Sequence, residues 1–274
     1  MKSAQELRDE YLTLIGDGRE EQVYQRFIEE NPRLVPRDFM QNHGLHLWLV
    51  LRKLSFGADY KSDFFFLSKS SDDWSAVFIE IEKPISRFFK DGSQEFHTDF
   101  VHALQQINTW RAWLSIDGNK QGFINQLNTI RVPAAMQRNP TYCKFVLVFG
   151  RRAEYQDSEL RRSRIHAEER DDFKIITFDS LAEGLASKDE LYVGVRRNEF
   201  IDIQNDEIVD DSLFIWADPN MLTVNERLYA KLEARVAKNR PSPPRITGHL
   251  MSNFHPNALK VKVRHDKATT APAS

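Results

Sequence analysis

Three acidic residues have a spacing that could hold a metal ion between two neighbouring strands. Asp63 lies in an apolar segment, and Glu80 and Glu82 lie two residues apart in the run Ile79-Glu80-Ile81-Glu82-Lys83. Side chains alternate faces along a strand, so Glu80 and Glu82 are predicted to share one face. If the hairpin turn is centred between residues 71 and 72, Asp63 lies directly opposite Glu80, with the two Cβ atoms roughly 4.5–5.5 Å apart.

Carboxylates grouped in this way need a neutralising partner. Like charges across a strand pair repel, and the apolar neighbours at 64–66 and 77–79 raise the cost of each charge. A divalent cation would remove the conflict, because carboxylate oxygens are the ligands that Mg²⁺ prefers. Such a cation also generates a hydroxide-like nucleophile that can attack a phosphodiester. The spacing leaves two interpretations open: a metal site of the kind that a nuclease uses, and a strand whose acids simply face solvent.

A mixed α/β fold is expected to position these residues. Polar turns and proline divide the chain into segments of helical or strand periodicity. The order helix, three strands, helix, strand is expected at 20–30, 45–56, 60–68, 75–83, 95–115 and 142–149, where Asn31-Pro32 ends the first helix and Pro84 closes the third strand. Further helices are expected at 120–130, 158–170, 180–187 and 224–238, and further strands at 173–178, 191–203 and 212–216.

The domain organisation follows from these segments. We expect an N-terminal extension over 1–18, an α/β domain over 19–216, a C-terminal helix over 217–240 and a flexible or partner-docked tail over 241–274. The tail is basic although the formal net charge is only −2, so the remainder must be acidic. The cations of this C-terminal region, set against the single acid Asp266, are Arg240, Arg245, Lys260, Lys262, Arg264 and Lys267.

Composition points to a cytoplasmic protein without a membrane partner. No apolar run approaches the roughly 20 residues that span a bilayer, and the polar N-terminus lacks the apolar core of a signal peptide. The single cysteine, Cys143, lies in an apolar run and cannot form an internal disulfide, so we interpret it as a buried structural thiol.

The order of these motifs resembles the PD-(D/E)XK nuclease superfamily. More narrowly, Glu29-Glu30-Asn31-Pro32, Asp63 and Phe78-Ile79-Glu80-Ile81-Glu82-Lys83-Pro84 resemble the Shedu anti-phage nuclease family, over about residues 20–113. The resemblance implies a restriction-endonuclease-like core with a mixed sheet (α-β-β-β-α-β) flanked by helices. It also implies Asp63 and Glu80 as ligands of Mg²⁺, with Mn²⁺ as an alternative, DNA of phage or plasmid as substrate, a role in bacterial defence, and a homo-oligomer.

One position departs from the superfamily pattern. The resemblance implies a lysine two residues after Glu80, whereas this chain has Glu82 there and Lys83 one residue later. Glu82 could act as the general base that accepts a proton from water, or a bulge near Pro84 could turn Lys83 inward. A third interpretation is a catalytically weakened module that binds nucleic acid or a protein partner. We favour active chemistry with Glu82 as the base and Lys83 as a supporting catalytic residue.

Two further side chains are candidates from the flanking helices. Gln106 begins the segment Gln106-Ile107-Asn108-Thr109-Trp110, which looks like the glutamine motif of the superfamily, so the resemblance implies that it orients ligands or substrate. Glu21 shares a helix face with Tyr24 and Ile28 and so points partly toward the core. The resemblance implies that a glutamate of the first helix can approach the metal, which makes Glu21 a third candidate ligand. Each has a plain alternative: a helix-surface glutamine for Gln106, and for Glu21 an acid favoured by the helix dipole.

Basic residues supply candidate phosphate contacts. Lys61 precedes Asp63 by two residues and is predicted to face the same side of the strand. Arg161, Arg162 and Arg164 form a basic cluster on an expected helix, where they would contact the phosphate backbone without sequence preference. Solvated surface positions are the alternative for all four residues.

Overall fold

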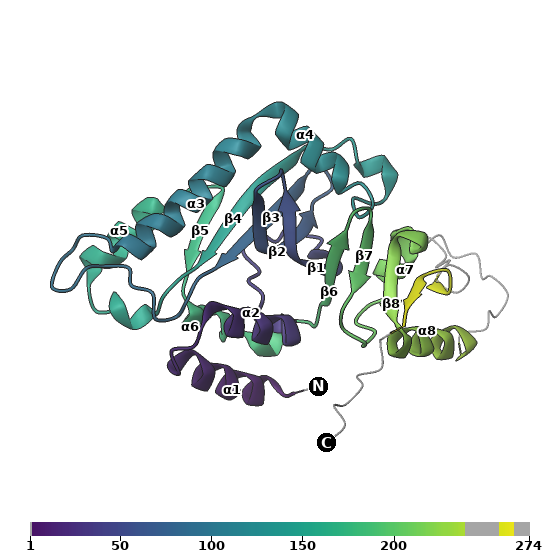
Figure 1. The fold of residues 1–274 in the computed structure, drawn as a ribbon, viewed down its shortest axis with the longest axis horizontal. Coiled ribbons are helices and arrows are strands. Elements are labelled where there is room, and N and C mark those ends of the chain that lie inside the picture. The colour runs from purple at the N-terminus through teal and green to yellow at the C-terminus, as the bar shows by residue number, and fades with distance from the viewer. Residues whose placement is uncertain (1, 239–257, 266–274) are drawn as a thin grey trace, which may run out of the picture.

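A nine-stranded mixed sheet forms the centre of the computed structural model, which describes residues 2–238 and 258–265. Helices cover both of its faces (Figure 1). The strands are β1 (Leu45–Phe56), β2 (Tyr60–Lys69), β3 (Trp74–Ile81), β4 (Thr141–Val148), β5 (Phe173–Ile176), β6 (Tyr192–Arg197), β7 (Phe200–Ile203), β8 (Leu222–Asn225) and β9 (Lys262–Arg264). The expected α/β class with a mixed sheet flanked by helices is therefore confirmed.

The helices divide between the two faces of the sheet. The α-helices are α1 (Ala4–Gly16), α2 (Glu21–Glu30), α3 (Thr98–Ser115), α4 (Asp117–Gln126), α5 (Glu159–Glu168), α6 (Phe178–Leu181), α7 (Ser212–Trp216) and α8 (Glu226–Lys238). Short 3-10 turns are η1 (Pro32–Leu34), η2 (Ala134–Met136), η3 (Arg152–Glu154), η4 (Leu185–Ser187) and η5 (Pro219–Met221). In Figure 1, α3 and α4 cross one side of the sheet and α1, α2 and α6 lie on the other.

The strand order is β5-β4-β3-β2-β1-β6-β7-β8-β9. The antiparallel meander β1-β2-β3 lies between the parallel partners β6 and β4. Phe64 pairs with Ile79 and Phe66 with Val77 across the β2–β3 hairpin. This is the register expected for a turn centred between residues 71 and 72.

Each face of the sheet has its own apolar core. Phe65 and Phe78 pack with Phe100 and Trp110 beneath α3, whereas Phe64 on the opposite face packs with residues of α1, α2 and α6. The alternation of side chains along β2 and β3 explains why the two phenylalanine sets face opposite helices. A strand buried on both faces reads as a continuous apolar run, as the segment 76–79 does.

Several segments differ from the sequence expectations, and one of them is Leu222–Asn225, which forms the strand β8 inside the expected C-terminal helix 217–240. Ser212–Trp216 forms the helix α7 and not a strand; a short apolar run has no periodicity that separates the two, and the side chain of Asp210 accepts a hydrogen bond from the Ser212 N–H at 2.7 Å. The extension 1–18 contains α1, whose Tyr11 is fully buried and donates a hydrogen bond to the Phe178 carbonyl at 3.0 Å.

The C-terminal region contains one more difference. Lys262–Arg264, within the expected tail 241–274, forms β9 and pairs with β8 in parallel. Arg240, Arg245 and Lys267 lie outside the described residues. In the described part of the chain, no helix combines the length and apolar character that crossing a bilayer requires.

Candidate active site

Asp63 and Glu80 lie next to each other at one end of the β2–β3 hairpin. Their positions directly follow the Phe64–Ile79 pair in the antiparallel register. Asp63 is 5% exposed, and its Oδ2 accepts a hydrogen bond from the Ile81 N–H at 2.8 Å. Burial raises the pKa of Asp63, and the ammonium of Lys53 opposes that shift. The hairpin therefore holds one carboxylate beside the backbone of the strand that carries the other.

The two carboxylate oxygens of Glu80 differ in their hydrogen bonding. Its Oε1 accepts a hydrogen bond from Nε2 of Gln106 on α3. Its Oε2 is enclosed and has no hydrogen-bond partner among the described residues. Burial raises the pKa of Glu80 well above its usual range, and the charges of Asp63 and Glu82 raise it further. A buried acceptor without a donor is costly unless a further group binds it.

Lys53 of β1 completes the polar contacts of Asp63, and the sequence interpretation missed it. Its Nζ forms an ion pair with Asp63 Oδ1. Arg52 pairs with Phe64 and Leu54 with Ser62, so Lys53 lies opposite Asp63 across β1 and β2. The signal was present in the sequence, because the turn at 57–59 gives this register by the same arithmetic that placed Asp63 opposite Glu80.

Glu82 remains in register at the end of β3. Its N–H donates a hydrogen bond to the Val148 carbonyl of β4 at 3.0 Å, which continues the parallel β3–β4 pairing. β3 ends at Ile81, and its pairing with β4 has no bulge up to that residue. The chain turns afterwards, where the Ser86 N–H bonds to the Lys83 carbonyl at 3.1 Å. Burial, followed by the charges of Glu21 and Asp63, raises the pKa of Glu82 to about 7, and Lys83 opposes the shift.

Glu21 approaches the same site from α2. Gln25, which is 4% exposed and one helical turn further on, donates a hydrogen bond from Nε2 to Glu21 Oε1 at 2.6 Å. Burial raises the pKa of Glu21, and the Asp63 charge adds to that effect. Lys53 and Lys83 both lower this pKa, so their ammonium groups lie within electrostatic range of Glu21.

The carboxyl groups fit a hard divalent cation with few protein ligands. Among the described residues, no group of three or more His, Cys, Asp or Glu side chains forms a metal cage. Mg²⁺ commonly binds one or two carboxylates and keeps several waters, so it needs no such cage. Glu80 Oε2 is enclosed and has no hydrogen-bond partner among the described residues, so it is the oxygen that would coordinate such an ion next to Asp63.

The four basic candidates lie in different environments. Lys61 is exposed on β2. Arg161 donates hydrogen bonds to the carbonyls of Glu154 at 3.1 Å and Ser93 at 2.7 Å, and its guanidinium lies 4.8 Å from the centroid of the Phe89 ring. Arg164 likewise donates a hydrogen bond to the Gln94 carbonyl, and its guanidinium lies over the Phe96 ring.

Arg162 differs from its two neighbours on α5. It is exposed and bonds to the Gln156 carbonyl near its own helix. Arg161 and Arg164 therefore anchor the segment between β3 and α3, and Arg162 has only a local contact.

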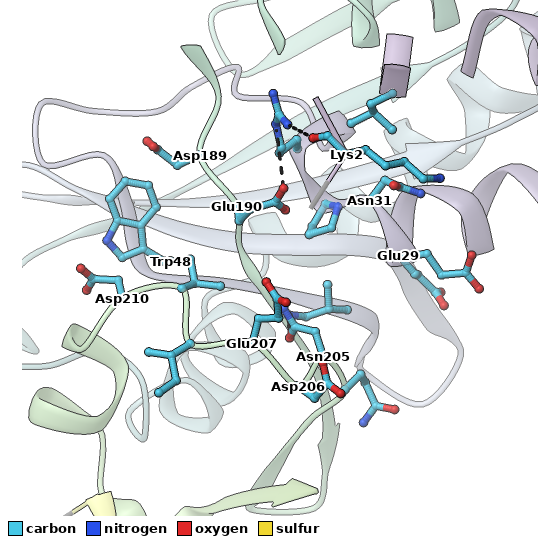
Figure 2. A pocket seen from close by; sticks show the side chains of 18 of the residues that line it. Lys2, Glu29, Asn31, Trp48, Asp189, Glu190, Asn205, Asp206, Glu207 and Asp210 are labelled. Atoms are coloured by element: carbon cyan, nitrogen blue, oxygen red, sulfur yellow. Dashed lines mark hydrogen bonds and ion pairs between the residues drawn. The ribbon is translucent and has the colours of Figure 1, made fainter. Parts of the chain in front are cut away.

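An acid-lined cavity lies where residues of α2, β1 and the segment after β7 meet. It has a volume of about 870 Å³, and Glu29 and Arg52, which form an ion pair at 2.7 Å, are part of its wall. Figure 2 shows Trp48 and several acids around it. The acids of its lining are Glu29, Glu30, Asp189, Glu190, Asp206, Glu207 and Asp210. Asp63, Glu80 and Glu82 are not part of this lining, and its negative charge is unfavourable for a polyanion.

The family model for the C-terminal part of Shedu protein SduA matches residues 18–182. The chain belongs to the Shedu family. Membership confirms the resemblance found in the sequence and implies a role in anti-phage defence. The matched region extends from the start of α2 to the end of α6 and contains every candidate site residue, whereas β6 to β9 lie outside it. No curated protein matches the chain.

Proposed function

We propose that this Shedu-family protein is a Mg²⁺-dependent DNA endonuclease with a restriction-endonuclease-like core. The observation that carries the proposal is the pair Asp63 and Glu80, with one buried Glu80 oxygen that no donor satisfies. Carboxylates on adjacent strands that face each other in an apolar sheet are unfavourable without a cation. Asp63 and Glu80 would hold the metal, which when bound polarises the phosphate and lowers the pKa of a water.

The remaining residues would position groups and move the proton. Gln106 fixes the orientation of the Glu80 carboxylate, and Glu21 adds negative charge on the α2 side of the site. Hydrolysis joins a water oxygen to phosphorus and breaks one P–O ester bond. Glu82 accepts the proton that the water loses, and the departing oxygen takes a proton from solvent. A carboxyl pKa of about 7 suits a general base near neutral pH.

The assembly and the substrate follow from the same chemistry. Cutting both strands of a duplex requires two hydrolytic events, so we propose a homo-oligomer that brings two sites onto one DNA molecule. Lys61, Arg161, Arg162 and Arg164 are the proposed contacts with the phosphate backbone. We place the protein in the cytoplasm, where phage or plasmid DNA would be encountered.

The second candidate is a nuclease-fold module that binds nucleic acid or a protein partner without cutting. The observation in its favour is the glutamate at position 82, where the superfamily pattern has lysine. This module would bind DNA with strong salt dependence but would show no Mg²⁺-dependent cleavage. It would also gain little thermal stability from millimolar Mg²⁺, because only a ligand that binds the folded state stabilises it.

Cleavage of supercoiled plasmid and linear duplex with Mg²⁺, Mn²⁺ or EDTA tests the proposal. Wild type is expected to nick or degrade DNA in either metal and not in EDTA, and Glu80→Ala is expected to lose this activity. Glu233→Ala, which removes an exposed acid of α8, is the matched control. Cleavage by Glu80→Ala at the wild-type rate would place the active site elsewhere.

A further inference from the structure

The Lys53 ammonium has N–H donors that its contact with Asp63 does not use. Among the described residues, the Asp63 carboxylate is the only hydrogen-bond partner of its ammonium. An ammonium carries three N–H donors, so one bond to Asp63 leaves two for another acceptor. The Lys53 side chain is 35% exposed and that of Asp63 only 6%, which puts the ammonium between the buried carboxylate and solvent. A ligand that enters from solvent would meet Lys53 before Asp63.

The backbone of β1 is distorted at the same residue. Leu49 and Leu51 belong to the core beneath α3, and so do Leu54 and Phe56. The alternation of faces along β1 therefore changes phase between residues 51 and 54. Lys53 lies at that change with a φ of +49°, a left-handed conformation that is uncommon for a side chain of this kind. Such strained conformations concentrate at functional sites.

Lys83 is the other lysine near these carboxylates, and it has no contact like that of Lys53 with Asp63. Within the described residues it forms no hydrogen bond or ion pair through its side chain. Its charge lowers the pKa of Glu21 and Glu82. Lys53 is thus the ammonium that directly bonds one of the two proposed metal ligands.

We propose that Lys53, supplied by β1, is the cation that contacts the phosphate undergoing cleavage, and that it replaces the lysine absent from position 82. The ligand is a non-bridging oxygen of a nucleic-acid phosphodiester next to the Asp63–Glu80 pair. Two free ammonium donors at the exposed side of Asp63 match the geometry and charge of such an oxygen. This inference rests on the proposed nuclease function for its catalytic part, but the phosphate contact itself can be measured without cleavage.

The test compares Lys53→Met, Lys53→Arg and Lys83→Met, with Lys238→Met on exposed α8 as a remote control. The first measurement is steady-state cleavage with Mg²⁺, reported as kcat and KM. The second is binding of a fluorescent duplex in Ca²⁺ over a range of NaCl concentrations, with gels confirming that the duplex stays intact. Thermal unfolding of every variant identifies any loss of folding.

Lys53→Met is expected to lower kcat by about 100-fold or more, the usual cost of losing one donor to transition-state charge. Its slope of log affinity against log salt should fall by about 0.9, one phosphate contact. Lys53→Arg should retain the wild-type slope and part of the activity, whereas Lys83→Met and Lys238→Met should change less than Lys53→Met in both measurements.

The inference is overturned if Lys53→Met retains both the cleavage rate and the salt slope, or if Lys83→Met loses more in each. Failure of the nuclease proposal gives a different result. In that case wild type does not cut DNA in Mg²⁺ at all, and the salt slopes alone decide whether Lys53 contacts a phosphate. If Lys53→Met only lowers the unfolding temperature and leaves the slope intact, Lys53 is a structural partner of Asp63 and the inference is wrong.

Discussion

Gln106 of α3 bonds to Oε1 of Glu80 and leaves Oε2 of the same carboxylate enclosed and unpartnered. The hydrogen bond fixes the plane of the carboxylate, so the lone pairs of the unpartnered Oε2 point in a defined direction. The donor comes from a helix packed over the sheet and not from the hairpin itself. A change of the α3 packing would therefore change the position of a proposed metal ligand.

Gln106→Leu is expected to weaken Mg²⁺ binding by about 10- to 100-fold, the usual effect of removing a partner that orients a metal ligand. The Mg²⁺ concentration that gives half-maximal cleavage measures this change. Gln105→Leu is the matched control, because Gln105 is its exposed neighbour on the same helix. An unchanged Mg²⁺ requirement in Gln106→Leu would assign the hydrogen bond to folding alone.

Asp63→Asn is expected to remove the stabilisation that Mg²⁺ gives to the folded protein. A ligand at one hundred times its dissociation constant stabilises by about 2.7 kcal/mol, and an amide in place of Asp63 is a much weaker ligand than a carboxylate. Differential scanning fluorimetry over a Mg²⁺ titration measures the loss. Asp59→Asn, at the exposed turn before β2, should respond like wild type. A full Mg²⁺ response in Asp63→Asn would contradict the assignment of Asp63 as a ligand.

The four acidic side chains of the candidate site also predict how the free energy of unfolding depends on pH. Burial and neighbouring acids raise the pKa of Glu82 from 4.5 to about 7, and Glu21, Asp63 and Glu80 shift in the same direction. The folded state then binds more protons than the unfolded chain, so the contribution of these groups falls as pH rises through this interval. A single group contributes a slope of at most about 1.4 kcal/mol per pH unit.

Urea unfolding between about pH 4.5 and 7 in EDTA measures this dependence. Glu82→Gln should flatten the decline, because the amide does not titrate, and millimolar Mg²⁺ should do the same for the wild type by neutralising the cluster. A decline that is equally steep in Glu82→Gln would show that other groups cause it.

Arg161→Ala is expected to lower the free energy of unfolding by about 1–2 kcal/mol, since it removes two hydrogen bonds to carbonyls and one contact with an aromatic ring. The segment around Ser93 should also become more sensitive to limited proteolysis. Arg162→Ala, from the exposed neighbour, should change either quantity little. Unchanged stability together with weaker DNA binding would favour the phosphate-contact role for Arg161.

Much of the site could be predicted because a hairpin register follows from simple counting. Asp63 and Glu80 were placed opposite each other from the turn and the two-residue period of strands, and the structure has that register. Lys53 was accessible to the same counting across the turn at 57–59. The left-handed backbone of Lys53 could not be predicted by counting, because φ at one residue depends on the packing of β1 between two layers.

Other features depend on contacts between distant segments. The helix at Ser212–Trp216 and the strand at Lys262–Arg264 are short, and local propensity does not decide between states at this length. The helix α1 is amphipathic, but its role depends on Tyr11 reaching the carbonyl of Phe178, which is 167 residues away. Such pairings are fixed by the tertiary fold and leave little trace in the local sequence.

The strand order also has a consequence for the boundaries of the family match. The matched region, residues 18–182, ends before β6, yet β6 pairs in parallel with β1 over 49–52 and 192–195. If the matched region stood alone, one side of β1 would present unpaired N–H and C=O groups beside buried leucines, which is a template for aggregation. By pairing with β1, β6 therefore protects this side of the matched region from pairing with another chain.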